Sequence, residues 1–116
     1  MGSLADLQED LSPEQASELA ASGQVRLVDV RETREWDEGR IAGARHVEMD
    51  HLSEEAGSLA GDPPVVFYCR SGHRSAVATQ AFRASGVVAY NLAGGLLAWV
   101  ERGLPLEPDD GRVAIH

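Results

Sequence analysis

The sequence predicts an α/β protein in which one sheet lies between two layers of helices. Short apolar runs rich in β-branched residues recur along the chain, and between them the apolar residues follow helical spacing. Because strands that alternate with helices form βαβ units, we expect a parallel sheet that is covered on both faces. The 116 residues predict one domain over 10–106, with a lead-in over 1–9 and a polar tail over 107–116 that is extended along the surface or mobile.

The first half of the chain begins with a clear helix start. Ser12 is a preferred N-cap residue, Pro13 suits the first helical position, and Glu14 adds an acid to the first turn. In a later short helix, Trp36 is expected to point inward and pack in the core. The expected elements are, in order, a strand near 8–11, a helix over 13–22, a strand over 25–30, a helix over 33–38, a strand over 44–47 and a helix from 50 that ends by 61.

The second half contains the best-bounded strand of the sequence. Residues 65–68 are β-branched or aromatic and follow two prolines, which is typical of a short buried strand. A helix is expected after Arg74, up to Ser85. The residues that recur at helical spacing on its apolar face are Val77, Ala78, Ala81 and Phe82.

A last strand and a last helix complete the expected sheet and its cover. The strand is predicted over 87–92, and Gly94 and Gly95 follow it. Two glycines at this point permit the backbone to approach a neighbouring loop closely. In the helix that begins after them, Trp99 is expected in the core, and Gly103 ends the helix.

Cys69, the single cysteine, stands between the buried strand and the helix that follows it. A loop that enters a helix N-terminus presents free backbone N–H groups and the positive end of the helix dipole. Arg70 and Arg74 add positive charge, so these surroundings stabilise a thiolate and bind an anion beside it. The alternative is an inert core cysteine, since free cysteine is among the most buried residue types. A core cysteine, however, does not need two arginines, a serine, a glycine and a histidine directly after it.

The loop and two further segments resemble one family. Residues 68–75, Tyr-Cys-Arg-Ser-Gly-His-Arg-Ser, are similar to the active-site loop of the rhodanese family of sulfurtransferases. Residues 27–44 resemble the family's N-terminal signature, and residues 92–99 resemble its C-terminal one. The departures are Arg40, where the family often has His, and Glu48, where Pro is common. Neither position takes part in the expected chemistry.

The resemblance implies a five-stranded parallel sheet and covalent sulfur transfer. Cys69 as a thiolate would take the outer sulfur of a donor such as thiosulfate, and cyanide or a protein thiol would accept it from the persulfide. Backbone N–H groups of 70–75 would hold the charge of the persulfide, and the two arginines would hold the dianionic donor. The expected substrate-binding residues are Arg70, Ser71, Gly72, His73, Arg74 and Ser75. The two serines are expected to donate to the sulfur, and His73 to contact the anion or face solvent.

Asp29 and Arg31 follow the second predicted strand and have two interpretations. Strand C-termini line the ligand crevice of a parallel sheet, which would make these residues a wall of the site. A turn-forming aspartate paired with a nearby arginine is the structural alternative. The sequence leaves both open.

Two other functions are also compatible with the loop. Cysteine phosphatases and arsenate reductases on the same fold have similar loops, with one more residue between cysteine and arginine. Here four residues separate Cys69 from Arg74, which is the shorter form, whereas a tetrahedral oxyanion needs the wider cradle. A non-catalytic persulfide carrier for a partner protein would have the same loop as the enzyme.

Charge and cysteine content limit the partners and the compartment. The formal net charge is −9, which argues against nucleic acid and anionic membranes, and no run reaches the length of a membrane span. Residues 1–62 have a balance of −10 and residues 63–116 of +1, so the loop lies in the less acidic half. One cysteine precludes an internal disulfide and fits a reducing, cytoplasmic compartment. We expect neither a metal nor a cofactor.

Overall fold

The computed structural model describes residues 8–114 and contains one five-stranded sheet. Its strands are all parallel, in the order β1-β5-β4-β2-β3, which confirms the predicted fold class. The expected elements are present with bounds within two residues of the prediction. They are β1 (Asp10–Leu11), α1 (Pro13–Ala21), β2 (Arg26–Asp29), α2 (Thr33–Glu38), β3 (Arg45–His46), the 3-10 turn η2 (Met49–His51), α3 (Leu52–Leu59), β4 (Val65–Tyr68), α4 (His73–Ala84), β5 (Ala89–Leu92) and α5 (Gly95–Glu101).

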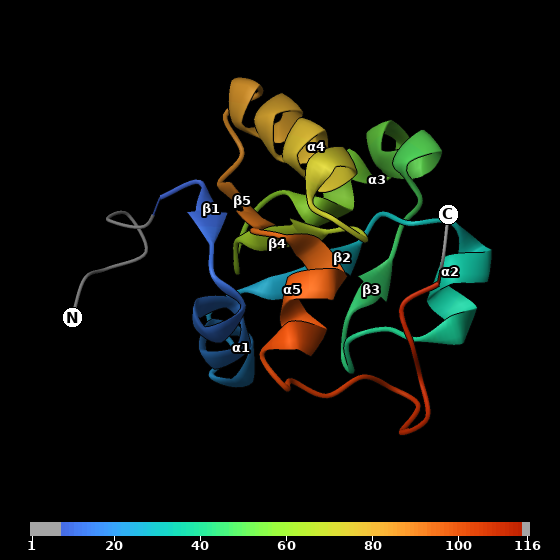
Figure 1. Cartoon of the computed structure of the whole chain (residues 1–116). Helices are drawn as coiled ribbons and strands as arrows, with labels where there is room; N and C mark the ends of the chain where they lie inside the picture. The colour runs from blue at the N-terminus through green and yellow to red at the C-terminus, as the bar shows by residue number, and fades with distance from the viewer. Residues whose placement is uncertain (1–7, 115–116) are drawn as a thin grey trace.

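Helices cover both faces of the sheet. Figure 1 shows α1 and α5 on one side and α3 and α4 on the other, with α2 beyond the β3 edge. One core cluster joins the inner side chains of α1 and α5, such as Leu96 and Trp99, to one face of the sheet. The second cluster joins α3 and α4 to the opposite face and contains Cys69 and Phe82. The three-layer prediction is therefore confirmed, and Trp99 is a core residue as expected.

Local sequence explains where the first two helices begin. The Ser12 hydroxyl accepts from the Gln15 backbone N–H, and the Gln15 side chain accepts from the Ser12 N–H, which completes a capping box before α1. Glu32 and Glu35 cap α2 in the same reciprocal way. Both arrangements satisfy N–H groups that a helix start leaves without partners.

The prediction that Trp36 packs in the core is wrong. Its ring is half-buried and stacks on His46 at a centroid distance of 4.7 Å, and the Arg40 guanidinium lies 5.0 Å from the centroid of the Trp36 ring. The inward position of α2 belongs to Glu35, which is fully buried. Because adjacent helical residues point about 100° apart, only one of the two can face the core.

Val77 also differs from the prediction. The buried line of α4 consists of Ser75, Ala78, Thr79 and Phe82. Val77 lies beside that line and is 61% exposed. The predicted helical spacing is therefore present, but the apolar side chains occupy two adjacent stripes, of which the sheet covers one.

The described part of the tail lies along the domain surface. Arg40 and Glu107 form an antiparallel bridge, and the Arg112 N–H donates to the Glu38 carbonyl at 2.9 Å. Ala114 is 4% exposed. The remaining lead-in and tail residues, 1–7 and 115–116, lie outside the described residues. From residue 8 to 114 the longest helix, α4, has 12 residues, and no helix there combines the length and hydropathy that crossing a membrane requires.

Candidate active site

The candidate site is the loop between β4 and α4, at the carboxyl edge of the sheet. Cys69 follows the last residue of β4 and is 1% exposed, and α4 begins only four positions later. Gly72 makes this tight connection with φ of 100°, a left-handed conformation that favours glycine. A Cβ at Gly72 would also come within 3.2 Å of the Gly94 nitrogen. The backbone of the loop is thus held close to the turn after β5.

The Cys69 sulfur faces three donors from the start of α4. The Gly72 N–H lies 3.1 Å from Sγ, the Ser75 N–H 3.5 Å and the Ser75 hydroxyl 3.4 Å. Hydrogen bonds from backbone N–H groups at a helix N-terminus favour the charged form of a thiol. The arrangement suits a sulfur anion at this position.

The turn after β5 fixes the loop from the other side. The Leu96 N–H donates to the Cys69 carbonyl at 2.8 Å, and the Leu97 N–H donates to the Arg70 carbonyl at 3.0 Å. A Cβ at Gly95 would lie 2.6 Å from each of these carbonyl oxygens. The close approach predicted for Gly94 and Gly95 is therefore confirmed.

Ser75 connects the sulfur to a buried polar network. Its hydroxyl lies 2.6 Å from the Asn91 Oδ1 atom, much closer than its 3.4 Å distance to Sγ. Asn91 Nδ2 donates to Asp10 at 3.0 Å and to the Gly72 carbonyl at 3.4 Å, which fixes the orientation of the amide. A hydroxyl has only one proton to donate, and the shorter distance shows that Ser75 donates it to Asn91. Ser75 must turn away from Asn91 to donate fully to the sulfur.

Arg74 forms a two-pronged ion pair with Glu35. Its Nη1 and Nη2 atoms lie 2.9 and 3.0 Å from the two carboxylate oxygens. The Glu35 side chain is fully buried, whereas the Arg74 side chain is 30% exposed. The hydrogen bonds that Arg74 donates to Glu35 raise the pKa of Arg74 above its ordinary value, against the opposing effect of burial. The sequence analysis did not single out Glu35. A capping box is usually marked by Ser or Thr at the N-cap, whereas the N-cap residue of α2 is Glu32.

The other loop residues point in different directions. Arg70 Nε donates to the Ala114 carbonyl at 3.0 Å, so its side chain lies against the tail. The Ser71 hydroxyl and the His73 Nδ1 atom lie 3.3 Å apart, and His73 is exposed. Among the predicted binding residues, the structure brings Gly72 and Ser75 to the sulfur. In the described part of the chain, Ser71 and His73 have no hydrogen bond to Sγ.

Asp29 and Arg31 form a buried ion pair. The Arg31 Nη2 atom lies 2.7 Å from Asp29 Oδ2 and 2.7 Å from the Gly39 carbonyl oxygen, and both side chains are 0% exposed. Burial opposes the charge of Arg31, but the hydrogen bonds and charge of Asp29 hold its pKa above the ordinary value. Burial and the charge of Asp29 also raise the pKa of neighbouring Tyr68, whose hydroxyl accepts from the Ile41 N–H. These contacts are the ones expected if Asp29 and Arg31 form a structural ion pair.

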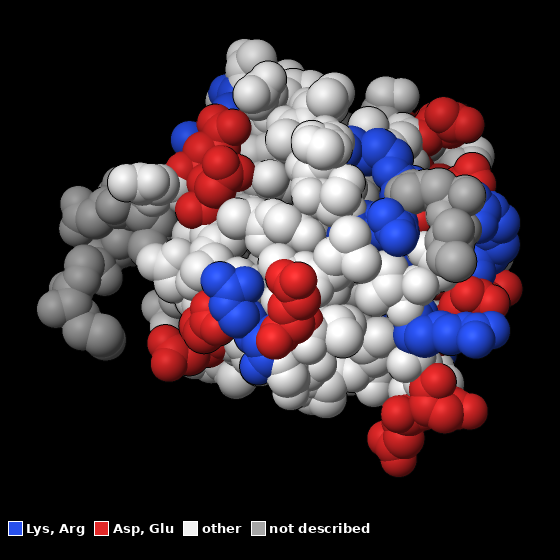
Figure 2. All heavy atoms as spheres, in the orientation of Figure 1, with Lys and Arg blue, Asp and Glu red and all other residues white. Residues whose placement is uncertain are grey.

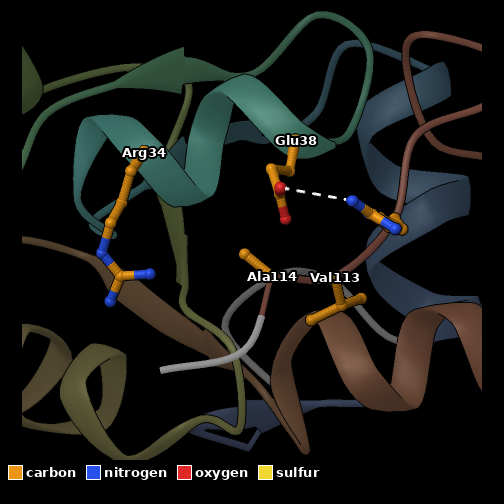
Figure 3. A pocket seen from close by; sticks show the side chains of 5 residues that line it. Arg34, Glu38, Val113 and Ala114 are labelled. Carbon is orange, nitrogen blue, oxygen red and sulfur yellow. Dashed lines mark ion pairs between the residues drawn. The ribbon is translucent and has the colours of Figure 1, made fainter.

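The protein surface has one hollow beside the loop and another at the tail. One, of about 190 Å³, lies at Arg74 and is lined by Val30, Glu32, Glu48, Met49 and Asp50 as well. The other, of about 430 Å³, separates α2 from the tail, where Arg34 and Glu38 face Val113 and Ala114 (Figure 3). Arg112 closes one side of this second hollow through its ion pair with Glu38 at 3.6 Å. From residue 8 to 114 no group of three or more His, Cys, Asp or Glu side chains is arranged to hold a metal ion.

This fold and this loop define a class of α/β proteins with a cysteine in an N–H-lined cradle at the sheet edge. The rhodanese-like domain model matches residues 12–102. A sulfurtransferase of Allochromatium vinosum is 36% identical over 94 residues, which cover 80% of this chain and 88% of that protein. The crystal structure of a rhodanese-related protein from Thermoplasma volcanium is 26% identical, with a TM-score of 0.79 over 85% of this chain and 97% of that one. The chain belongs to the rhodanese-like domain family.

The relatives differ in length, and only some of them are named as sulfurtransferases. The uncharacterized protein YqhL of Bacillus subtilis is 39% identical over 75 residues, which cover 64% of this chain and 60% of that protein. The chain thus matches about three fifths of the length of this relative. The family and the relatives named as sulfurtransferases support sulfur transfer as the general activity.

Proposed function

We propose that this protein transfers sulfane sulfur from a small donor such as thiosulfate to a thiophilic acceptor through a persulfide on Cys69. The observation that carries the proposal is the cradle around the sulfur, with the Gly72 and Ser75 N–H groups 3.1 and 3.5 Å from Sγ. These donors suit an anion of one or two sulfur atoms. The acceptor is cyanide in an assay, or a thiol of another protein.

The donor step consists of one displacement. The Cys69 thiolate attacks the outer sulfur of thiosulfate, a bond forms between the two sulfurs, and the bond to the sulfonate sulfur breaks. Its electron pair leaves with sulfite, so the enzyme retains a persulfide anion. We expect the N–H groups that face Sγ to share the charge of the added sulfur.

The acceptor step restores the thiolate. Cyanide attacks the outer sulfur of the persulfide, the sulfur–sulfur bond breaks, and its electron pair returns to Cys69 as thiocyanate leaves. No proton is needed in either step, so the loop requires no general acid. This agrees with the composition of the cradle, in which the groups that face the sulfur are N–H and hydroxyl donors.

The two arginines have different parts in this proposal. The terminal nitrogens of Arg70 have no hydrogen bond to any residue from 8 to 114, since only Nε is engaged, at the Ala114 carbonyl. They are therefore available to a dianionic donor at the loop. The charge of Arg74 is balanced by Glu35, so Arg74 contributes less to donor binding and more to holding the start of α4 against α2. Ser71 and His73 are proposed as outer contacts of the donor.

The length of the loop favours this activity over hydrolysis of a phosphate or reduction of arsenate. Four residues separate Cys69 from Arg74. The sulfur already lies within hydrogen-bond distance of the Gly72 and Ser75 N–H groups, so a tetrahedral oxyanion bonded to it would displace these groups. The cradle accommodates a single added sulfur with a smaller shift.

The test is the intact mass of the protein after incubation with thiosulfate. Wild type should gain one sulfur atom, lose it on addition of cyanide, and release thiocyanate. Cys69→Ser should do neither and should keep its circular-dichroism spectrum, because the exchange is nearly isosteric. Thiocyanate formation by Cys69→Ser, or turnover of an aryl phosphate by wild type without a persulfide, would show that the proposal is wrong.

A further inference from the structure

An apolar groove lies between α3 and α4 on the outer side of the domain. Its volume is about 390 Å³, and most of its lining is aliphatic or aromatic. Its apolar lining includes Met49, Leu52, Ala56, Val77, Ala81 and Phe82. Val77, at 61% exposure, is the most exposed large apolar side chain of the described chain. An apolar side chain left in water beside a groove is a common mark of a contact surface.

The groove leads to the cysteine loop. Met49 lines both the groove and the hollow at Arg74, so the two spaces share a wall. Val77 lies one helical turn after His73, the first residue of α4. A segment of another molecule in the groove would therefore have one end at the hollow beside Arg74, next to the loop that carries Cys69.

The hollow at Arg74 has an acidic lining. Glu32, Glu48 and Asp50 line the hollow at Arg74, and the charge of Arg74 is matched by Glu35. Between residues 8 and 114, neither Glu48 nor Asp50 forms an ion pair with an arginine. Figure 2 shows further acidic side chains over the position of α3. The apolar groove is thus bordered by negative charge at the end that adjoins Arg74.

We infer that this groove binds a basic, apolar segment of a partner protein whose thiol accepts the sulfur from Cys69. The inference rests on the proposed function and names its acceptor. Apolar side chains of the partner fill the space between α3 and α4, and its Lys or Arg residues face Glu48 and Asp50. A second copy of this chain is a poor occupant, because the chain has a net charge of −9 and contains no lysine.

Transfer to such a partner balances in one displacement. The partner thiolate attacks the outer sulfur of the Cys69 persulfide, and a sulfur–sulfur bond forms on the partner. The bond to Cys69 breaks, and its electron pair restores the Cys69 thiolate. The proton of the partner thiol is lost to solvent before the attack. Because Cys69 is 1% exposed, a thiol on a guided segment reaches it more readily than a thiol on a flat surface.

The test uses two synthetic amphipathic peptides of about 12 residues, with leucines at helical spacing and one terminal cysteine. The remaining positions are lysine in one peptide and glutamate in the other. The full-length protein is loaded with sulfur from thiosulfate, and persulfide on each peptide is followed by mass spectrometry. We expect about tenfold faster transfer to the lysine peptide, and Glu48→Gln with Asp50→Asn should remove most of the difference.

Val77→Ser tests the apolar part of the groove, and Val88→Ser is its matched control. Val88 is 55% exposed and does not line the groove. Val77→Ser should slow transfer to the lysine peptide about tenfold and leave thiocyanate formation unchanged, because cyanide does not use the groove. Val88→Ser should change neither rate. Equal effects of the two serine variants, or equal rates with both peptides, would overturn the inference.

Binding is measured separately, so that failure of sulfur loading does not obscure the result. A fluorescein-labelled lysine peptide with serine in place of cysteine is titrated with the protein, and anisotropy is recorded. Saturable binding that Val77→Ser weakens supports the groove, even if Cys69 takes no sulfur from thiosulfate and the proposed function fails. Absence of binding overturns the inference. So does a dimer in light scattering that Val77→Ser dissociates, since the groove would then bind a second copy.

Discussion

Removing Arg74 should destabilise the fold far more than neutralising Glu35, although the two side chains form one ion pair. Glu35 is fully buried, whereas the Arg74 side chain is 30% exposed. Arg74→Ala therefore leaves a carboxylate in the interior without its counterion. Glu35→Gln leaves an arginine that can turn to water, and the glutamine keeps an acceptor for the N–H groups that Glu35 now binds.

The expected magnitudes follow from this difference in burial. Loss of one partner from a buried pair costs about 3–5 kcal/mol when the other charge stays buried. Glu35→Gln should cost only about 1–2 kcal/mol, because the buried side chain is then neutral and the arginine that loses its counterion is partly exposed. Since domains of this kind have about 5–15 kcal/mol of stability, Arg74→Ala should consume a large share of it. Replacing both residues, by Glu35→Leu with Arg74→Met, should recover most of the loss.

Urea denaturation followed by circular dichroism gives the free energies of unfolding. Arg102→Ala is the control, because its ion pair with Glu14 is exposed and should contribute less than about 1 kcal/mol. Equal losses from Arg74→Ala and Glu35→Gln would refute the reasoning.

Three further changes test the loop. Gly95→Ala should lower the free energy of unfolding by about 2 kcal/mol or more and reduce sulfur transfer, because the added Cβ would lie 2.6 Å from two carbonyl oxygens. Its control is Gly57→Ala, whose Cβ would have nothing within 4 Å and which should stabilise α3 slightly in thermal unfolding. Ser75→Ala leaves the Asn91 carbonyl without its donor and should cost about 1–3 kcal/mol in urea denaturation, and adding Asn91→Leu should recover part of this loss. One glycine inserted after Gly72 should widen the cradle and abolish thiocyanate formation, and retained activity would contradict the role of loop length.

The order of the elements could be predicted because each is coded locally. Ser12 and Pro13 determine the start of α1, and the β-branched run over 65–68 is a strand by composition and by its flanking prolines. The position of Cys69 between a strand and a helix also follows from local signals. The same holds for the close approach at Gly94 and Gly95, because two residues without a Cβ directly after a strand leave room for another backbone.

The sequence did not reveal which of two neighbouring side chains on a helix is buried. Glu35 and Trp36 are neighbours on α2, and hydrophobicity alone favours the tryptophan for the interior. The charge of Arg74, 39 positions away, reverses this preference, since a buried carboxylate is stable only beside its counterion. Val77 is a similar case, because its exposure depends on where α3 lies.

The sequence by itself determined the α/β class, the order of strands and helices, and a loop that places Cys69 before the N–H groups of a helix start. These features depend on residues close to one another in the chain, and local propensity and spacing suffice to predict them. Only the tertiary structure decided the partners of Arg70 and Arg74, the network from Ser75 to Asp10, and the groove beside Val77. Each of these joins segments that are distant in sequence, and the packing of the whole sheet with its helices determines which of them meet.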